Sequence, residues 1–277
     1  MSAWHAGAGL LLGAVVSGVA APATLPAQDR LTAHVIVDSS YHRPRRVWVY
    51  TPAGYDPHRT TPYPLLLAFD GEEYRDTMPL PRVLDSLAAA GAAPGFVAVL
   101  IDDSSGAVRL ADLANSARMV TFLAEQLLPW VRRGWHVTSD PARVIVTGSS
   151  AGGLGAAYVA FERPDLFGNV WSQSGAFWRG AEASNEPPWE WLTAQVSRLP
   201  RRNVRFMLDV GALEDHRTLG GQGPNFLDAS RRFHDALARK GYDVTYDEVP
   251  GGNHAPEWWR TRLAVGVAAL SAAWPRP

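Results

Sequence analysis

The junction around Ser150 constrains the fold of this chain more than any other stretch. An apolar run over residues 144–147 leads into Gly148-Ser149-Ser150-Ala151-Gly152, and a segment of small residues and helix formers follows. The glycines two positions on either side of Ser150 remove side chains that would clash in a sharp turn from a strand into a helix. Such a turn raises the serine hydroxyl above the edge of a sheet, close to the N-terminus of the next helix. Because strand and helix patterns flank the pentapeptide, Ser150 is predicted to be a nucleophile rather than part of an ordinary loop.

The alternation of apolar runs with helical patterns predicts the architecture. Strand-like runs occur at 31–37, 43–51, 63–69, 96–101, 143–147, 170–173, 204–210 and 242–249, and helical patterns at 80–90, 110–131, 154–161, 226–240 and 256–273. Residues 180–200 show no clear period and are predicted to form an insertion over the site. Alternating strands and helices predict an α/β fold, with a mostly parallel sheet covered on both faces and an antiparallel N-terminal edge.

The first 27 residues have the composition of a secretory signal. Residues 6–19 are uncharged and rich in Ala, Gly, Val and Leu, and small residues follow, so cleavage is expected between Ala20 and Ala27. The alternative is a retained N-terminal anchor, because the apolar run lies near the lower length limit for a membrane span. The prediction is a secreted or periplasmic protein with one folded domain over 30–277, which contacts a membrane only if the segment is retained.

Composition excludes several other kinds of site. The formal net charge is −1, which gives no electrostatic reason to expect nucleic acid as a partner. The chain has no cysteine, which excludes disulfides, thiolate metal ligands and a cysteine nucleophile. The acidic run over residues 70–73 has no neighbouring histidines, so no metal site is predicted there.

A nucleophilic serine needs a general base, and the base needs a third group to hold its tautomer. Glu214 follows the predicted strand at 204–210 and is the predicted acid. Asp215 is the alternative, and Asp209 is less favoured because it lies inside the strand. This chain order, in which the acid comes after the serine and each follows a strand, is typical of a sheet whose catalytic groups share one edge.

His254 is the predicted general base. It follows the last predicted strand and comes shortly after Gly251 and Gly252, which let the loop fold back over the sheet edge. The other histidines after the serine fit the role less well. His216 adjoins the predicted acid, and His234 lies inside a predicted helix.

The oxyanion formed by attack of the serine needs two preset hydrogen-bond donors. The backbone N–H of Ala151, next to the nucleophile, is the first predicted donor. The second is expected from the loop after the predicted strand at 63–69, where either Gly71 or Glu72 supplies it.

Segments spread over about residues 45–270 resemble, in order, the esterase family of the α/β-hydrolases. The resemblance is strongest to catalytic domains of the enterochelin esterase type, within the group that includes esterase D. The matching segments are Phe69-Asp70-Gly71-Glu72, Leu100-Ile101-Asp102, Glu125-Gln126-Leu127-Leu128-Pro129, Gly148-Ser149-Ser150-Ala151-Gly152-Gly153, Trp171-Ser172-Gln173-Ser174-Gly175, and Gly251-Gly252 ahead of Trp259-Arg260.

The resemblance implies an α/β-hydrolase fold and hydrolysis of carboxylic esters by Ser150, His254 and Glu214. It implies no cofactor, a small-molecule ester as the partner, and Arg109 as a cleft residue that contacts the substrate. The family often has Gly-Gly-His, whereas here Asn253 stands between the second glycine and the histidine.

Aromatic residues near the predicted cleft are expected to stack on an aromatic or sugar group of the substrate. Tyr74, Trp178 and Trp258 are predicted to face it. Other functions remain open beside enterochelin esterase-like hydrolysis. They are a feruloyl or acetyl esterase acting on polysaccharide, an acyltransferase with the same triad, and a non-catalytic ligand-binding protein of the same fold.

Overall fold

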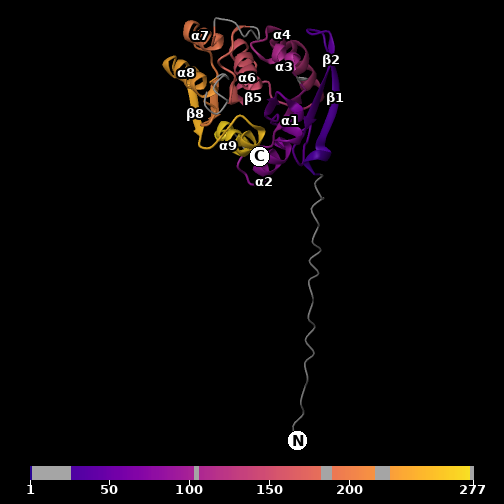
Figure 1. Cartoon of the computed structure of the whole chain (residues 1–277). Helices are drawn as coiled ribbons and strands as arrows, with labels where there is room; N and C mark the ends of the chain where they lie inside the picture. The colour runs from indigo at the N-terminus through magenta and orange to yellow at the C-terminus, as the bar shows by residue number, and fades with distance from the viewer. Residues whose placement is uncertain (2–25, 103–105, 182–188, 216–224, 275–277) are drawn as a thin grey trace.

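The computed structural model describes Met1 and residues 26–102, 106–181, 189–215 and 225–274 of the chain. Figure 1 shows a sheet flanked by helices on both sides, with the indigo strands of the N-terminal part at one end and the orange strands of the C-terminal part at the other. The predicted signal segment falls, apart from its two ends, outside the described residues. Within them, no helix has the length and apolar character needed to cross a membrane.

The described part of the chain forms one sheet of eight strands in the order β1-β2-β4-β3-β5-β6-β7-β8. The strands are β1 (Leu31–Asp38), β2 (Arg43–Tyr50), β3 (Leu65–Ala68), β4 (Val97–Ile101), β5 (Val144–Ser149), β6 (Asn169–Gln173), β7 (Arg205–Gly211) and β8 (Asp243–Val249). Pairing is antiparallel between β1 and β2 and between β2 and β4, and parallel across the rest of the sheet. The predicted α/β-hydrolase architecture with an antiparallel N-terminal edge is confirmed.

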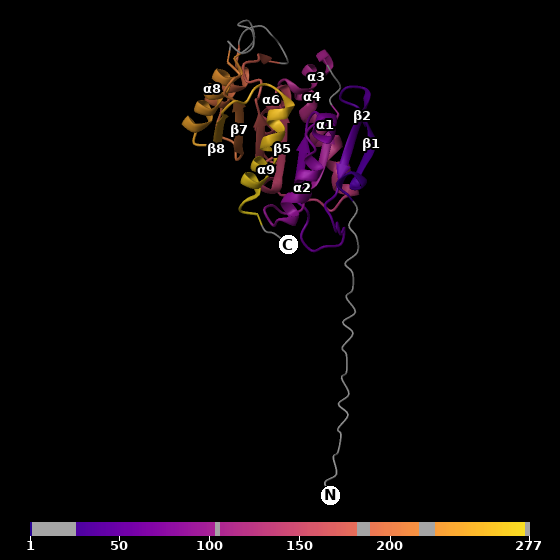
Figure 2. The ribbon, with the colours of Figure 1, turned by 60° about the horizontal axis from the view of Figure 1, so that its bottom comes forward.

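Helices cover the sheet in two layers. One layer holds α1 (Gly71–Asp76), α2 (Leu80–Ala89) and α9 (Pro256–Ser271), which Figure 2 brings in front of the sheet. The other holds α3 (Gly106–Leu113), α4 (Ala117–Thr121), α5 (Leu128–Gly134), α6 (Ala151–Glu162), α7 (Trp191–Arg198) and α8 (Phe226–Arg239). Short 3-10 turns lie at Ala27–Arg30 and Pro141–Arg143, and a π-helical turn lies at Phe122–Leu127.

The strand sequences explain how both layers are filled. Successive residues of a strand point to opposite faces of the sheet. On β3, Leu65 and Leu67 belong to the core beneath α3–α8, whereas Leu66 and Ala68 belong to the core beneath α1, α2 and α9. A continuous apolar run is therefore what a central strand covered on both faces requires.

The prediction of one helix over 110–131 is wrong. Helix α3 ends at Leu113 and α4 begins at Ala117. Between them, Asn115 adopts a φ of 56° and its amide donates to the Gly180 carbonyl at 2.8 Å. The Ser116 hydroxyl then caps α4 by accepting the N–H of Met119 at 3.3 Å. The apolar period continues across the break because α3 and α4 bury residues in the same core, so periodicity alone conceals the two ends.

Residues 180–200 show no clear period in the sequence, yet the structure has a helix in this region. Helix α7 occupies part of this region, and its buried Leu192 and Val196 join the core on the side where α7 packs against α8. Residues 182–188 lie outside the described residues.

Candidate active site

Ser150 occupies a sharp turn between β5 and α6. Its φ of 58° and ψ of −119° lie outside the regions usual for a residue with a side chain. A Cβ on Gly148 would lie 2.5 Å from the carbonyl carbon of Gly152, so the turn closes only because that side chain is missing. The Ser150 N–H donates to the Gln173 carbonyl at 2.9 Å, and the Ser150 carbonyl accepts the N–H of Ala176 at 2.9 Å. The segment after β6 thus holds the strained turn in place.

The side chains of Ser150, His254 and Glu214 meet at the edge where the parallel strands end. His254 Nε2 lies 3.0 Å from Ser150 Oγ, and His254 Nδ1 lies 2.6 Å from Glu214 Oε2. An ionised carboxylate only accepts hydrogen bonds, so Nδ1 donates to Glu214 and Nε2 is left to accept from the serine hydroxyl. The arrangement can therefore take a proton from Ser150. His254 makes both contacts although Asn253, rather than a glycine, precedes it.

The three candidate acids lie in two places. Glu214 is the carboxylate that contacts His254, next to Asp215 in the same loop. Asp209 lies within β7, where its carboxylate accepts the indole N–H of Trp171 at 3.0 Å.

The loops that carry the acid and the base fit tightly together. Glu214 is fully buried, and its Oε1 accepts the backbone N–H of Gly211 at 2.8 Å. A Cβ on Gly211 would lie 2.4 Å from the carbonyl carbon of Gly252. The two loops approach this closely because each has a glycine at the contact, which brings the base beside the acid.

The predicted oxyanion donors lie at two helix N-termini. Ala151 is the first residue of α6, and Gly71 and Glu72 are the first two of α1. The N–H groups of a first helical turn have no acceptor within the helix, so they are available to a developing negative charge. Helix α1 starts hard against β4, since a Cβ on Gly71 would lie 2.6 Å from the backbone N of Ile101.

Arg109 links the two turns that carry the predicted oxyanion donors. Its guanidinium forms a two-point ion pair with the carboxylate of Asp70, whose second contact measures 2.6 Å, and also donates to the Ser149 carbonyl at 3.3 Å. Asp70 precedes α1, and Ser149 precedes the nucleophile. Arg109 therefore holds the α1 loop against the serine turn from the edge of the site.

Aromatic side chains pack on one side of His254, the predicted general base. The Phe226 ring lies 4.1 Å from the His254 ring, centroid to centroid, and Trp178 lies 6.2 Å from Phe226 in an edge-on arrangement. The guanidinium carbon of Arg179 sits 4.5 Å from the centroid of Trp178. The structure thus places the predicted Trp178 near the site by way of Phe226.

The prediction that Tyr74 faces the substrate is wrong. Tyr74 is fully buried, and its hydroxyl donates to Gln173 Oε1 at 2.8 Å. The helix that carries it begins at Gly71, which turns the Tyr74 side chain into the core beneath α1, α2 and α9. Trp258, also predicted to face the substrate, is half-buried and packs over Gly251 in the loop that carries the base.

Buried charges surround the site. Burial raises the pKa of the Asp209 carboxyl to about 7, against the lowering effects of Trp171 and Arg262. Burial also raises the pKa of Glu73 on α1, and the neighbouring Asp70 adds to the shift. Burial lowers the pKa of the Arg179 guanidinium.

Sequence reasoning missed several residues of the site, among them Ser174, Phe226 and Asp70. Phe226 opens a predicted helix, and its apolar side chain gave no sign of a contact with the base. Two signals pointed to Ser174: it directly follows a strand at the carboxyl edge of the sheet, and it lies in one of the segments that resemble the esterase family.

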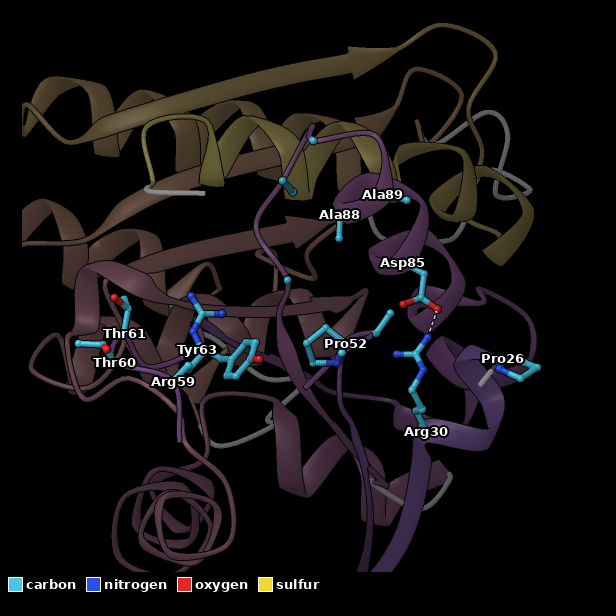
Figure 3. Close-up of a pocket in the computed structure, with 15 residues that line it drawn as sticks. Pro26, Arg30, Pro52, Arg59, Thr60, Thr61, Tyr63, Asp85, Ala88 and Ala89 are labelled. Carbon is cyan, nitrogen blue, oxygen red and sulfur yellow. Dashed lines mark hydrogen bonds and ion pairs between the residues drawn. The ribbon is translucent and has the colours of Figure 1, made fainter. Parts of the chain in front are cut away.

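An open cavity of about 910 Å³ lies elsewhere on the molecule. Figure 3 shows Arg30 paired with Asp85 on one side of it, and Arg59 beside Tyr63 on the other. Tyr63 and Gly95 come just before β3 and β4, so this cavity borders the edge where parallel strands begin, opposite the triad.

Known esterases are similar to this chain in sequence and in fold. An iron(III) enterobactin esterase of Dickeya dadantii is 31% identical over 271 residues, which cover 93% of this chain and 58% of that protein. The crystal structure of the enterobactin esterase of Shigella flexneri, in the presence of enterobactin, superimposes with a TM-score of 0.75 at 26% identity, covering 87% of this chain and 58% of that one.

A ferulic acid esterase of the anaerobic fungus Anaeromyces mucronatus shares the fold, with a TM-score of 0.68 at 17% identity over 90% of this chain and 97% of that one. The present chain thus spans little more than half the length of the enterobactin esterases it resembles. Residues 39–270 match the family described as "Putative esterase". The chain belongs to this esterase family of the α/β-hydrolase fold.

Proposed function

We propose that this protein is a serine hydrolase of carboxylic esters that acts through Ser150, His254 and Glu214. The observation that carries the proposal is the unbroken hydrogen-bonded series from the serine hydroxyl through the imidazole to the buried carboxylate, with contacts of 3.0 and 2.6 Å. A serine becomes nucleophilic at neutral pH when such a base removes its proton.

The proposed reaction has two halves. Ser150 Oγ attacks the ester carbonyl carbon while its proton passes to His254 Nε2, and Glu214 stabilises the imidazolium that forms. The oxyanion accepts hydrogen bonds from the N–H of Ala151 and from the start of α1, at Gly71 or Glu72. The imidazolium then protonates the departing alcohol, which leaves an acyl-serine. Water, activated by the same histidine, attacks the acyl-serine and releases the acid.

For the substrate, we propose a small ester with an aromatic group. Relatives are named for their action on enterobactin, and one was crystallised in its presence. In this chain, the half-buried Trp178, which packs edge-on against Phe226 beside His254, supports stacking on a ring.

The N-terminal residues 1–27 are proposed to act as a secretory signal, which would place the enzyme in the periplasm or outside the cell. The support is their composition alone. Expression of the full chain, followed by cell fractionation and N-terminal sequencing, tests it. An intact N-terminus in the membrane fraction would favour the anchor.

A fluorophosphonate probe and a substrate panel test the proposed chemistry. We expect one covalent adduct on Ser150 and hydrolysis of p-nitrophenyl acetate that is lost in Ser150→Ala. The panel then compares a catecholate ester, a feruloyl sugar and an acetylated sugar, with and without an added alcohol acceptor. Transfer to the acceptor would indicate an acyltransferase, and failure of the probe to label Ser150 would indicate a non-catalytic ligand-binding protein.

A further inference from the structure

We propose that Ser174 is a positioning residue that holds the triad acid Glu214 in the orientation its partner histidine requires. The inference rests on the proposed function, because it assigns a role within the same triad. Its basis is a contact of 2.5 Å between Ser174 Oγ and Glu214 Oε1.

The fold places Ser174 between the nucleophile and the acid. In the sheet, β6 lies between β5, which ends at the nucleophile, and β7, which leads to the acid. Ser174 is the first residue after β6, and its N–H donates to the Asp209 carbonyl of β7 at 2.7 Å. The Ser174 backbone is therefore bonded to β7, the strand that leads to Glu214, and the Ser174 side chain contacts Glu214 directly.

The backbone of Ser174 is in a costly conformation. Its φ is 47°, in the left-handed region that residues with a side chain seldom adopt. Such strain persists where the surrounding structure holds it, and it is concentrated at functional sites. Here the conformation directs the hydroxyl at Glu214.

The direction of the hydrogen bond is determined by the two partners of the hydroxyl. Trp259 Nε1 lies 2.9 Å from Ser174 Oγ, and an indole N–H can only donate. Ser174 Oγ accepts that hydrogen bond, so its own proton is directed at the Glu214 carboxylate, which can only accept. The result is a one-way series from Trp259 through Ser174 to Glu214.

Glu214 thereby has both oxygens engaged. Oε1 accepts from Ser174 and from the N–H of Gly211, while Oε2 accepts from His254. Two donors on Oε1 prevent the carboxylate from rotating, which keeps Oε2 aimed at the imidazole. Trp259 also meets the His254 ring edge-on at 5.0 Å, so the same side chain restrains both partners.

Burial rules out direct contact between Ser174 and the substrate. Ser174 is 1% exposed and Glu214 is fully buried. An effect of Ser174 on catalysis must therefore pass through the side chains that it contacts, Glu214 and Trp259, which is why the assigned role is positioning.

The test compares Ser174→Ala with Ser172→Ala in the full-length protein. Ser172 lies two residues earlier, within β6, is equally buried, and its hydroxyl has no hydrogen-bond partner in the described part of the chain. Both variants remove one buried hydroxyl, but only Ser174→Ala removes a donor to the acid. We expect kcat on p-nitrophenyl acetate to fall about 10- to 100-fold in Ser174→Ala, with KM changed less than about twofold. Ser172→Ala should keep the wild-type kcat.

A spectroscopic readout separates positioning from general damage. The proton on His254 Nδ1 is shared with Glu214 in a short contact, so it should give a downfield proton NMR resonance. We expect this resonance to shift or broaden in Ser174→Ala and to remain in place in Ser172→Ala. Trp259→Phe, which removes only the indole donor, should produce a smaller change in the same direction.

The outcomes distinguish this inference from the proposed function. Equal kcat and an unchanged resonance in Ser174→Ala and Ser172→Ala would overturn the positioning role, and so would a rise in KM alone. If Ser174→Ala does not fold, the resonance and kcat of Trp259→Phe decide the question in the same way. Wild-type turnover in Ser150→Ala would instead overturn the proposed function itself.

Discussion

The two ends of the parallel strands differ in what they carry: one borders a large cavity, and the other carries the predicted catalytic triad. The amino ends of β3 and β4 border an open cavity of about 910 Å³ (Figure 3). The carboxyl ends of β5, β7 and β8 lead to Ser150, Glu214 and His254. At the cavity end, Arg30 and Tyr50 both donate to Asp85, so these three polar groups are bonded to one another. At the triad end, they form a series that ends on a half-buried hydroxyl.

The difference shows that the volume of a cavity alone does not indicate where a catalytic site lies. Polar groups bonded to one another in this way stabilise the structure. A directed series transmits the effect of a buried charge to one accessible atom, which is what nucleophilic catalysis needs. In this chain the directed series lies at the sheet edge where the α6 and α1 N-termini add donors.

The largest effect should come from the nucleophile. Ser150→Ala removes the attacking atom, so we expect kcat for p-nitrophenyl ester hydrolysis to fall about 10⁴- to 10⁶-fold while the fold is kept. Arg59→Ala at the cavity end serves as the control and should keep the wild-type rate. Stopped assays with both purified variants check the comparison, and a large loss in Arg59→Ala would contradict it.

The next effect concerns the acid. Glu214→Gln keeps the shape of the side chain but removes its charge, and we expect kcat to fall about 10³- to 10⁴-fold because the imidazolium loses its stabilising partner. Asp215→Asn is the matched control, since it neutralises the adjacent carboxylate of the same loop. A greater loss in Asp215→Asn than in Glu214→Gln would assign the acid role to Asp215.

The third prediction concerns the response of a buried carboxyl in β7, on the triad side, to pH. The pKa of Asp209 rises from an ordinary value of 3.8 to about 7 on folding, because the carboxyl is buried. The folded state therefore binds this proton more tightly than the unfolded state does. The stability that the proton contributes is complete below about pH 4 and is lost as the pH rises through about 7.

Denaturant unfolding of Asp209→Asn and the wild type between pH 4 and 8 checks this. The wild type should lose on the order of 4 kcal/mol relative to the variant as the pH rises from 4 to 8. Asp247→Asn alters the other carboxylate that contacts Arg262 and should follow the wild-type trend. Parallel curves for Asp209→Asn and the wild type would contradict the shift.

The smallest effect is expected at the cavity end. Asp85→Asn weakens the pairing with Arg30 and Tyr50, and we expect the free energy of unfolding to fall by about 1 kcal/mol because the pair is partly exposed. Hydrolysis should be unchanged. A loss of activity that exceeds the loss of folded protein would show that the two ends are coupled.

The sequence by itself determined the strand order along the chain, the turn at Ser150, and the positions of Glu214 and His254 after strands. These features depend on apolar period, glycine positions and chain order, which are local properties. The break at Asn115 and helix α7 could not be predicted from the apolar period. Neighbouring helices bury residues in one shared core, and those contacts determine where each helix begins and ends.

Only the tertiary structure decided that Tyr74 points into the core and that Ser174 contacts the acid. Both depend on which segments the sheet brings side by side: Tyr74 meets Gln173 across 99 residues, and Ser174 meets Glu214 across 40. No local pattern encodes the direction of such a side chain, because the partner that holds it lies on a different strand or helix. The candidate catalytic residues could therefore be predicted from the sequence. The side chains that hold them in place are determined only by the tertiary structure, which brings distant strands and helices together.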